Sequence, residues 1–125
     1  IGAVKNKDWK YLEGEVAAVS RETTDAGAAL KIILETSILT DEEIIRCCEI
    51  YRNHPVQFLK TSTGFADGGA TVHAVQLMRK HLPANIQIKA SGGIRTYKFA
   101  KQLIDAGANR LGCSASVAII GEAAT

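Results

Sequence analysis

Short apolar runs alternate with longer amphipathic segments along the whole chain. The apolar runs are rich in β-branched residues and have the length of strands; they cover residues 29–36, 56–64, 86–93 and 110–116. The segments between them have the periodicity of one-sided helices and cover residues 8–26, 40–51, 70–82 and 96–107, with a last helix after Ser116. Strands that alternate with helices in this way are typical of βα units in a parallel sheet.

Local signals mark where several of these helices begin and end. Asp8 is a good N-cap for the first helix, and Thr40 with Glu43 has the form of a capping box. Pro55 and Pro83 each close a unit, because proline cannot continue a helix. The residues before Asp8 read as the exit from a strand into a loop.

Two architectures fit this order of elements: an open doubly wound sheet and part of a TIM (β/α)8 barrel. No G-x-G-x-x-G opens a helix, which disfavours a dinucleotide-binding sheet. Polar residues gather where the runs end, as they do in barrel active sites. Alternate strand residues share a face, so the pairs expected on one face are Lys31 and Glu35, Lys60 and Ser62, and Lys89 and Ser91. We therefore expect an α/β fold of the TIM-barrel family with about four βα units, a half-barrel or a fragment.

Length, charge and cysteine content narrow the class of protein. The 125 residues suit one small domain over 1–125, and 15 basic against 13 acidic residues leave a net charge of +2. No basic run is interleaved with aromatics, which argues against nucleic acid, and no apolar run reaches the roughly 20 residues of a membrane span. Three cysteines, two of them adjacent, make neither a disulfide framework nor a metal site. We expect reduced thiols and a cytoplasmic protein.

Lys60 and Lys89 lie inside two neighbouring apolar strands, which is the most informative feature of the chain. An ammonium group in a buried strand loses water and gains no fixed partner from the strand itself. Two such charges about 5 Å apart at an effective dielectric of about 20 repel by roughly 3 kcal/mol, which favours loss of a proton. A deprotonated amine is a nucleophile for carbonyl groups. The pair therefore points to amine chemistry.

Three glycine-bearing loops follow the last three strands: Thr63-Gly64, Gly92-Gly93 and Gly112 ahead of Ser114. Glycine lets backbone N–H groups approach an anion closely, and the helix that follows adds its positive N-terminal end. Barrels often bind a phosphate at the loops after their last two strands. The sequence therefore predicts a phosphate site on this rim. Arg95 either assists the phosphate or is a solvated loop residue.

The motifs FLKTSTGF (58–65), IKASGGIRT (88–96) and LGCSAS (111–116), with LKIILET (30–36) before them, resemble the C-terminal half of the deoxyribose-phosphate aldolase family. The resemblance runs over nearly the whole chain. It implies a class I aldolase on a (β/α)8 barrel, which reversibly joins acetaldehyde to glyceraldehyde 3-phosphate to give 2-deoxy-D-ribose 5-phosphate. No metal or organic cofactor is implied, since the imine itself takes up the electrons of the broken bond.

The resemblance also implies roles for individual residues. Lys60 matches the Schiff-base lysine, and Lys89 matches the second lysine, which depresses the pKa of the nucleophile and joins a proton relay. The residues that match the substrate- and phosphate-binding rim are Thr63, Gly64, Gly92, Gly93 and Ser114. Lys31 and Glu35 match polar residues of the barrel mouth and are given supporting roles.

One departure from the family pattern concerns an aspartate of the proton relay. The family carries it on a strand just before the segment that Ile1 to Ala3 resembles, so the 125 residues begin after it. Four parallel strands also leave a barrel open. We therefore expect a fragment, a self-associating half-barrel or part of a longer chain, as a homo-oligomer or joined to an N-terminal half. The 125 residues by themselves are expected to be weakly active.

Two other functions remain open at this point. A half-barrel that keeps the phosphate rim without catalysis would act as a binding or assembly module. Another class I Schiff-base aldolase with a different pair of aldehydes would share the same lysines. A covalent adduct on Lys60 with acetaldehyde distinguishes an aldolase from the binding module.

Overall fold

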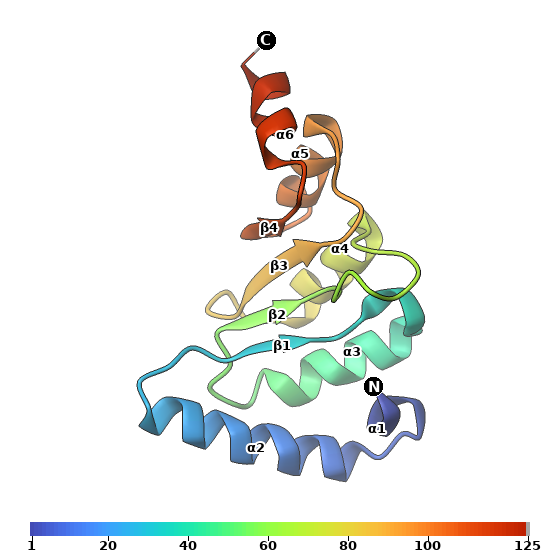
Figure 1. The fold of residues 1–125 in the computed structure, drawn as a ribbon. Coiled ribbons are helices and arrows are strands. Elements are labelled where there is room, and N and C mark those ends of the chain that lie inside the picture. Colours follow the sequence, from blue (N-terminus) through green and yellow to red (C-terminus); the bar gives the residue numbers. More distant parts are fainter. Residues whose placement is uncertain (125) are drawn as a thin grey trace.

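A computed structural model describes residues 1–124, with four parallel strands in one sheet (Figure 1). They are β1 (Lys31–Ile33), β2 (Phe58–Lys60), β3 (Gln87–Ser91) and β4 (Arg110–Gly112). The strands neighbour one another in chain order, β1-β2-β3-β4. A doubly wound sheet needs a point where the strand order reverses, and this sheet has none. The chain thus forms four βα units, about half of a (β/α)8 barrel.

A helix follows or precedes each strand, and most of the predicted ends are confirmed. The long helices are α2 (Trp9–Asp25), α3 (Asp41–Tyr51), α4 (Val72–His81), α5 (Tyr97–Asp105) and α6 (Ser116–Ala123). Asp8 caps α2 by accepting from the Tyr11 N–H, and Thr40 with Glu43 forms a complete capping box for α3. Each cap satisfies a backbone donor that a helix start leaves free, so these ends could be predicted from sequence.

The N-terminal segment is a helix, and the prediction of a strand exit there was wrong. The short α1 (Gly2–Lys5) closes with a bond from the Lys5 N–H to the Ile1 carbonyl (2.9 Å). Val4 is buried in the core, and the Lys5 ammonium donates to Glu43 (2.9 Å). A single turn is too short to show helical periodicity, so packing rather than pattern determines it.

The strands are shorter than predicted, and β1 ends before Glu35. Glu35 has φ 62° and ψ 58°, in the left-handed region, and the chain then forms the 3₁₀ turn η1 (Thr36–Ile38). Glu35 therefore does not continue the alternation of Lys31 and Ile33, and the expectation that Lys31 and Glu35 point the same way was wrong. The Leu34 N–H still bonds to the Lys60 carbonyl (2.9 Å), so the segment stays beside β2.

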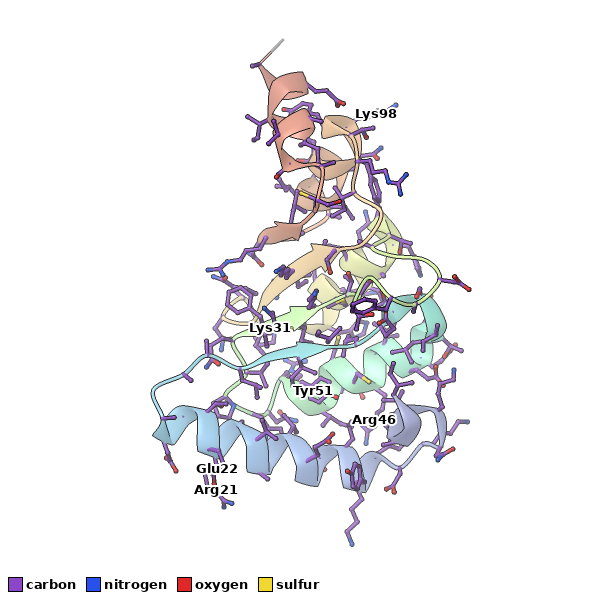
Figure 2. All side chains as sticks on the ribbon, viewed as in Figure 1. Arg21, Glu22, Lys31, Arg46, Tyr51 and Lys98 are labelled. Atoms are coloured by element: carbon purple, nitrogen blue, oxygen red, sulfur yellow. The ribbon has the colours of Figure 1, made fainter. Side chains whose placement is uncertain are left out.

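The two faces of the sheet differ in what covers them. Leu59, Ile88 and Ala90 are fully buried against the helix layer, together with Val75 of α4 and Leu103 of α5. The alternate strand residues lie on the other face, which Figure 1 shows without a helix over it. Figure 2 shows Lys31 on β1 and Tyr51 beneath the sheet, toward α2. The open face is therefore where chemistry-bearing side chains can meet a ligand.

Two buried thiols in α3 are expected to make the free energy of unfolding depend on pH in the alkaline range. Cys47 and Cys48 are free and fully buried, and burial raises the pKa of Cys47 to about 11 and of Cys48 to about 12. Above pH 9 the unfolded chain loses these protons while the folded chain keeps them, so the free energy of unfolding falls as the pH rises. Between pH 8 and pH 10.5 we expect a loss on the order of 4 kcal/mol, about 2 kcal/mol from each thiol, read from urea midpoints. The double variant Cys47→Ala/Cys48→Ala should show a flatter slope; an equal slope would contradict this cause.

Candidate active site

Lys60 and Lys89 lie side by side on the open face. The register places Lys60 directly opposite Lys89, with Ile33 on its other side and Arg110 beyond Lys89. Both lysine side chains are half-buried. Burial lowers the pKa of Lys89, and the charges of Lys31, Lys60 and Arg110 lower it further. Lys89 therefore holds its proton less tightly than a solvated lysine does.

No acidic residue balances these cations within the strands. The residues of β1–β4 that share this face are Lys31, Ile33, Phe58, Lys60, Gln87, Lys89, Ser91, Arg110 and Gly112. The Arg110 guanidinium lies 4.5 Å from the centroid of the Phe58 ring. The face of the ring attracts the cation but adds no negative charge that would neutralise it. The cations give this face a positive charge, which favours anionic ligands.

A shallow cavity of about 220 Å³ opens at the carboxyl ends of β2, β3 and β4. Four of the five predicted rim residues line it: Gly64, Gly92, Gly93 and Ser114. Arg95 also lines it and brings a positive charge. Next to Ser114, Ala115 is the N-cap residue of α6 and offers no side-chain cap, so the first N–H groups of the helix have no side-chain acceptor there. Free N–H groups at a helix start are suited to an anion.

Gly112 lines this cavity and also lies against the side chain of Lys89. A Cβ at position 112 would lie 3.0 Å from Lys89 Cε and 2.9 Å from the Ser91 Cβ. The missing side chain therefore makes room for the Lys89 stem beside the cavity. Sequence reasoning noted Gly112 only as a loop glycine, because its contact with Lys89 arises from strand pairing.

We expect Gly112→Ala to displace the Lys89 amine. If Lys89 takes part in catalysis, turnover should fall about 10- to 100-fold, since displacement of a catalytic group by about 1 Å has effects of this size. Steady-state kinetics on the purified variant measure this. Gly14→Ala is the control, because a Cβ at position 14 meets nothing within 4 Å. Equal activity of Gly112→Ala and the parent would show that the Lys89 position does not matter.

The residues that line the cavity differ from the predicted phosphate rim at Thr63, Ile94 and Cys113. Thr63 was expected on the phosphate rim, but its hydroxyl bonds to Glu35 and it is not among the residues that line the cavity. Ile94 and Cys113 do line it and were missed, because an apolar side chain and a thiol give no phosphate signal. Their positions follow from the loops that carry the glycines.

Buried hydroxyl groups join the ends of β2 and β3. The Thr61 hydroxyl accepts from the Ser91 N–H (3.1 Å), and the Ser91 hydroxyl donates to the Ser62 carbonyl (2.7 Å). The Ser62 hydroxyl donates to Thr61 Oγ1 (3.1 Å). Ser62 was expected to line the face of Lys60, but β2 ends at Lys60 and Ser62 is fully buried. These bonds fix the strand ends that carry both lysines.

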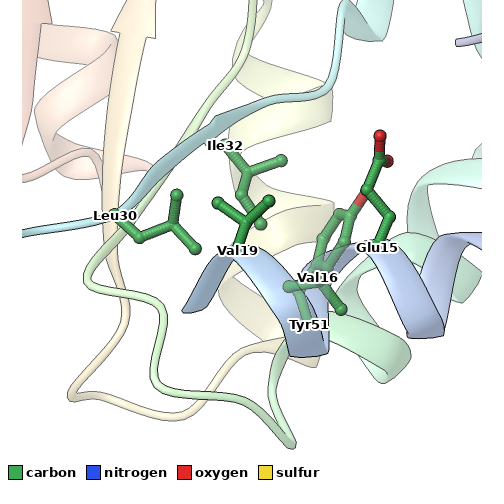
Figure 3. A pocket seen from close by; sticks show the side chains of 6 residues that line it. All are labelled: Glu15, Val16, Val19, Leu30, Ile32 and Tyr51. Atoms are coloured by element: carbon green, nitrogen blue, oxygen red, sulfur yellow. The ribbon is translucent and has the colours of Figure 1, made fainter. Parts of the chain in front are cut away.

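A second pocket lies at the edge of the sheet and has a different character (Figure 3). It measures about 140 Å³ and lies between α2 and the β1 segment; its lining is Glu15, Val16, Val19, Leu30, Ile32 and Tyr51. Figure 3 shows Leu30 and Ile32 pointing toward Val19. With no basic group in its lining, this pocket is a packing gap beside an edge strand rather than an anion site.

Within residues 1–124, no group of three or more His, Cys, Asp or Glu side chains is placed to hold a metal ion. Over the same range, every helix is too short or too polar to cross a membrane.

The chain is similar in sequence to proteins of known name. No protein-family model matches it. Over 120 residues it is 48% identical to the deoxyribose-phosphate aldolase of Thermococcus kodakarensis and 52% identical to that of Lactococcus lactis subsp. lactis. Each match covers 96% of this chain and 54% of the relative. Over nearly its whole length the chain is therefore similar in sequence to about half of each of these deoxyribose-phosphate aldolases.

Solved structures agree with the sequence matches. The aldolase QR15 superimposes with a TM-score of 0.86 at 38% identity, covering 98% of this chain and 55% of that one. The deoxyribose phosphate aldolase of Aeropyrum pernix, described as tetrameric, gives a TM-score of 0.83 at 27% identity, covering 94% and 50%. The chain thus spans about half the length of the deoxyribose-phosphate aldolases it matches, in sequence and in fold.

Proposed function

We propose that the protein is a deoxyribose-phosphate aldolase, which reversibly cleaves 2-deoxy-D-ribose 5-phosphate to glyceraldehyde 3-phosphate and acetaldehyde. The observation that carries this proposal is the pairing of Lys60 with Lys89 next to an anion cavity. The similarity to named aldolases over 96% of the chain supports the same reaction.

In this proposal the Lys60 amine attacks the carbonyl carbon of the substrate and water leaves, which gives an iminium ion. The iminium accepts the electron pair of the breaking carbon–carbon bond and becomes an enamine, while the glyceraldehyde 3-phosphate leaves. The enamine is then protonated and hydrolysed, which releases acetaldehyde and restores the amine. Lys89, whose pKa is lowered, is the group beside Lys60 that can accept and return the protons.

The phosphate would lie in the cavity at the strand ends. Backbone N–H groups near Gly64, Gly92 and Gly93 and at the start of α6 would donate to its oxygens, with Arg95 adding charge. This places the phosphate end of the substrate next to Gly112, and therefore close to Lys89.

For the 125 residues by themselves, we propose imine formation with slow turnover. The open face of the four strands carries no carboxylate, so part of the proton transfer lacks a partner. Proton transfer typically contributes about 10²–10⁴-fold. We also propose that the chain associates, with copies of itself or with further barrel strands, since edge strands β1 and β4 each have a free side.

Borohydride reduction with acetaldehyde tests the proposed chemistry. We expect one stable adduct per chain by intact mass, because reduction converts the imine to an amine that cannot hydrolyse. Binding of inorganic phosphate without any adduct would instead support the non-catalytic binding module. An adduct together with failure to cleave 2-deoxy-D-ribose 5-phosphate would support another class I aldolase.

A further inference from the structure

Glu35 is the most unusual buried residue near the site. Its side chain is 3% exposed, and its backbone is in the left-handed region with φ 62° and ψ 58°. Only one carboxylate oxygen, Oε2, has partners, whereas the buried Oε1 has none among the described residues. A non-glycine residue in this conformation and a half-satisfied buried carboxylate both cost stability. Two such costs at one position indicate a role other than folding.

Both bonds of Glu35 Oε2 reach the loop after β2. The oxygen accepts from the Thr63 N–H (3.1 Å) and from the Thr63 hydroxyl. The Thr63 hydroxyl in turn accepts from the Phe65 N–H (3.1 Å). A hydroxyl has one proton and two lone pairs, so donation to Glu35 orients its lone pairs toward Phe65. The backbone on both sides of Gly64 is therefore held by one carboxylate.

Gly64 is the loop residue that lines the anion cavity. It has φ 98°, so its own conformation is easily changed and gives the loop little rigidity. Thr63 and Phe65 are exposed, so burial does not fix them either. The bonds to Glu35 are the contacts that hold this stretch in place.

We propose that Glu35 is a positioning residue that fixes Thr63 and thereby directs the backbone at Gly64 into the phosphate cavity. The inference rests on the proposed function for the identity of the substrate. It predicts that Glu35 acts on binding of the phosphate end of the substrate and leaves imine chemistry at Lys60 unchanged.

The matched variants are Glu35→Gln, which keeps an acceptor oxygen, and Glu35→Met, which has similar length and no strong acceptor. We expect Glu35→Met to raise KM for 2-deoxy-D-ribose 5-phosphate and to weaken inhibition by inorganic phosphate about tenfold, since the loop loses both bonds. KM for unphosphorylated 2-deoxyribose and the rate of acetaldehyde adduct formation should stay unchanged. Glu35→Gln should recover most of the phosphate affinity.

Thr63 provides an independent pair of variants on an exposed residue, in case Glu35→Met fails to fold. Thr63→Val removes the hydroxyl and should reproduce the phosphate defect, whereas Thr63→Ser should restore affinity. Glu43→Gln is the control for loss of a buried carboxylate, because Glu43 caps α3 far along the chain from the cavity loops. It should lower the urea midpoint without changing phosphate affinity.

Two results separate this inference from the proposed function. If the parent protein forms no adduct with acetaldehyde, the aldolase proposal fails, while a phosphate defect in Glu35→Met and Thr63→Val still supports the positioning role. If the adduct forms but both variants bind inorganic phosphate like the parent, or raise KM equally for both sugars, the positioning role of Glu35 is overturned.

Discussion

If the chain cleaves 2-deoxy-D-ribose 5-phosphate as proposed, replacing Lys60 with alanine should lower turnover by about 10⁴-fold or more, because the proposed nucleophilic amine is missing. The same change will abolish the acetaldehyde adduct under borohydride. Lys60 is half-buried on a three-residue strand that backbone hydrogen bonds hold in place. Coupled assay of glyceraldehyde 3-phosphate and intact mass measure the two effects.

Lys98 offers a matched control for this loss. It is an exposed lysine on α5, and Figure 2 shows it away from the sheet. Lys98→Ala should keep both turnover and adduct formation. Substantial turnover in Lys60→Ala, with Lys98→Ala at the parental rate, would place the nucleophile elsewhere.

The second large effect is expected from Lys89→Met, which fills similar space without charge. At neutral pH we expect turnover to fall by about 10²–10⁴-fold, because in the proposed reaction the variant loses its proton carrier. Burial and the neighbouring cations lower the pKa of Lys89, so its titration lies below that of a solvated lysine. In Lys89→Met this titration is absent, so the pH profile of activity should lose the corresponding step.

A pH profile of kcat/KM separates this account from a structural role for Lys89. A merely damaged site would lose activity equally at every pH, whereas Lys89→Met should change the shape of the profile, because the titration of Lys89 is gone. Thiol ionisation weakens the fold above pH 9, so the profile is best measured up to that pH with the urea midpoint as a check. A uniform loss with a profile of parental shape would contradict the role given to Lys89.

The parts of the fold that depend on local chemistry were predictable from sequence. Asp8 and Thr40 cap helices through their own side chains, and short apolar runs rich in β-branched residues predict strands. The pairing of Lys60 with Lys89 could also be predicted, because neighbouring parallel strands joined by helices of similar length pair at corresponding positions. These features need no knowledge of distant contacts.

The features that sequence missed depend on distant contacts. The left-handed turn at Glu35 is held by bonds to Thr63, 28 residues away, and nothing near Glu35 in the sequence indicates it. The need for glycine at position 112 comes from Lys89 on the adjacent strand. The helix at the N-terminus forms because Val4 packs into a core made by other segments. In each case a tertiary contact determines the structure, and the local sequence pattern by itself does not predict it.

The most direct test of the account is to find which lysine carries the reduced acetaldehyde adduct, by peptide mapping of the trapped protein. The open face offers two adjacent amines, and the lowered pKa of Lys89 makes it a real competitor. The account predicts modification at Lys60, with Lys89 and Lys31 unmodified. An adduct on Lys89 in the parent protein would contradict the assignment of roles within the pair.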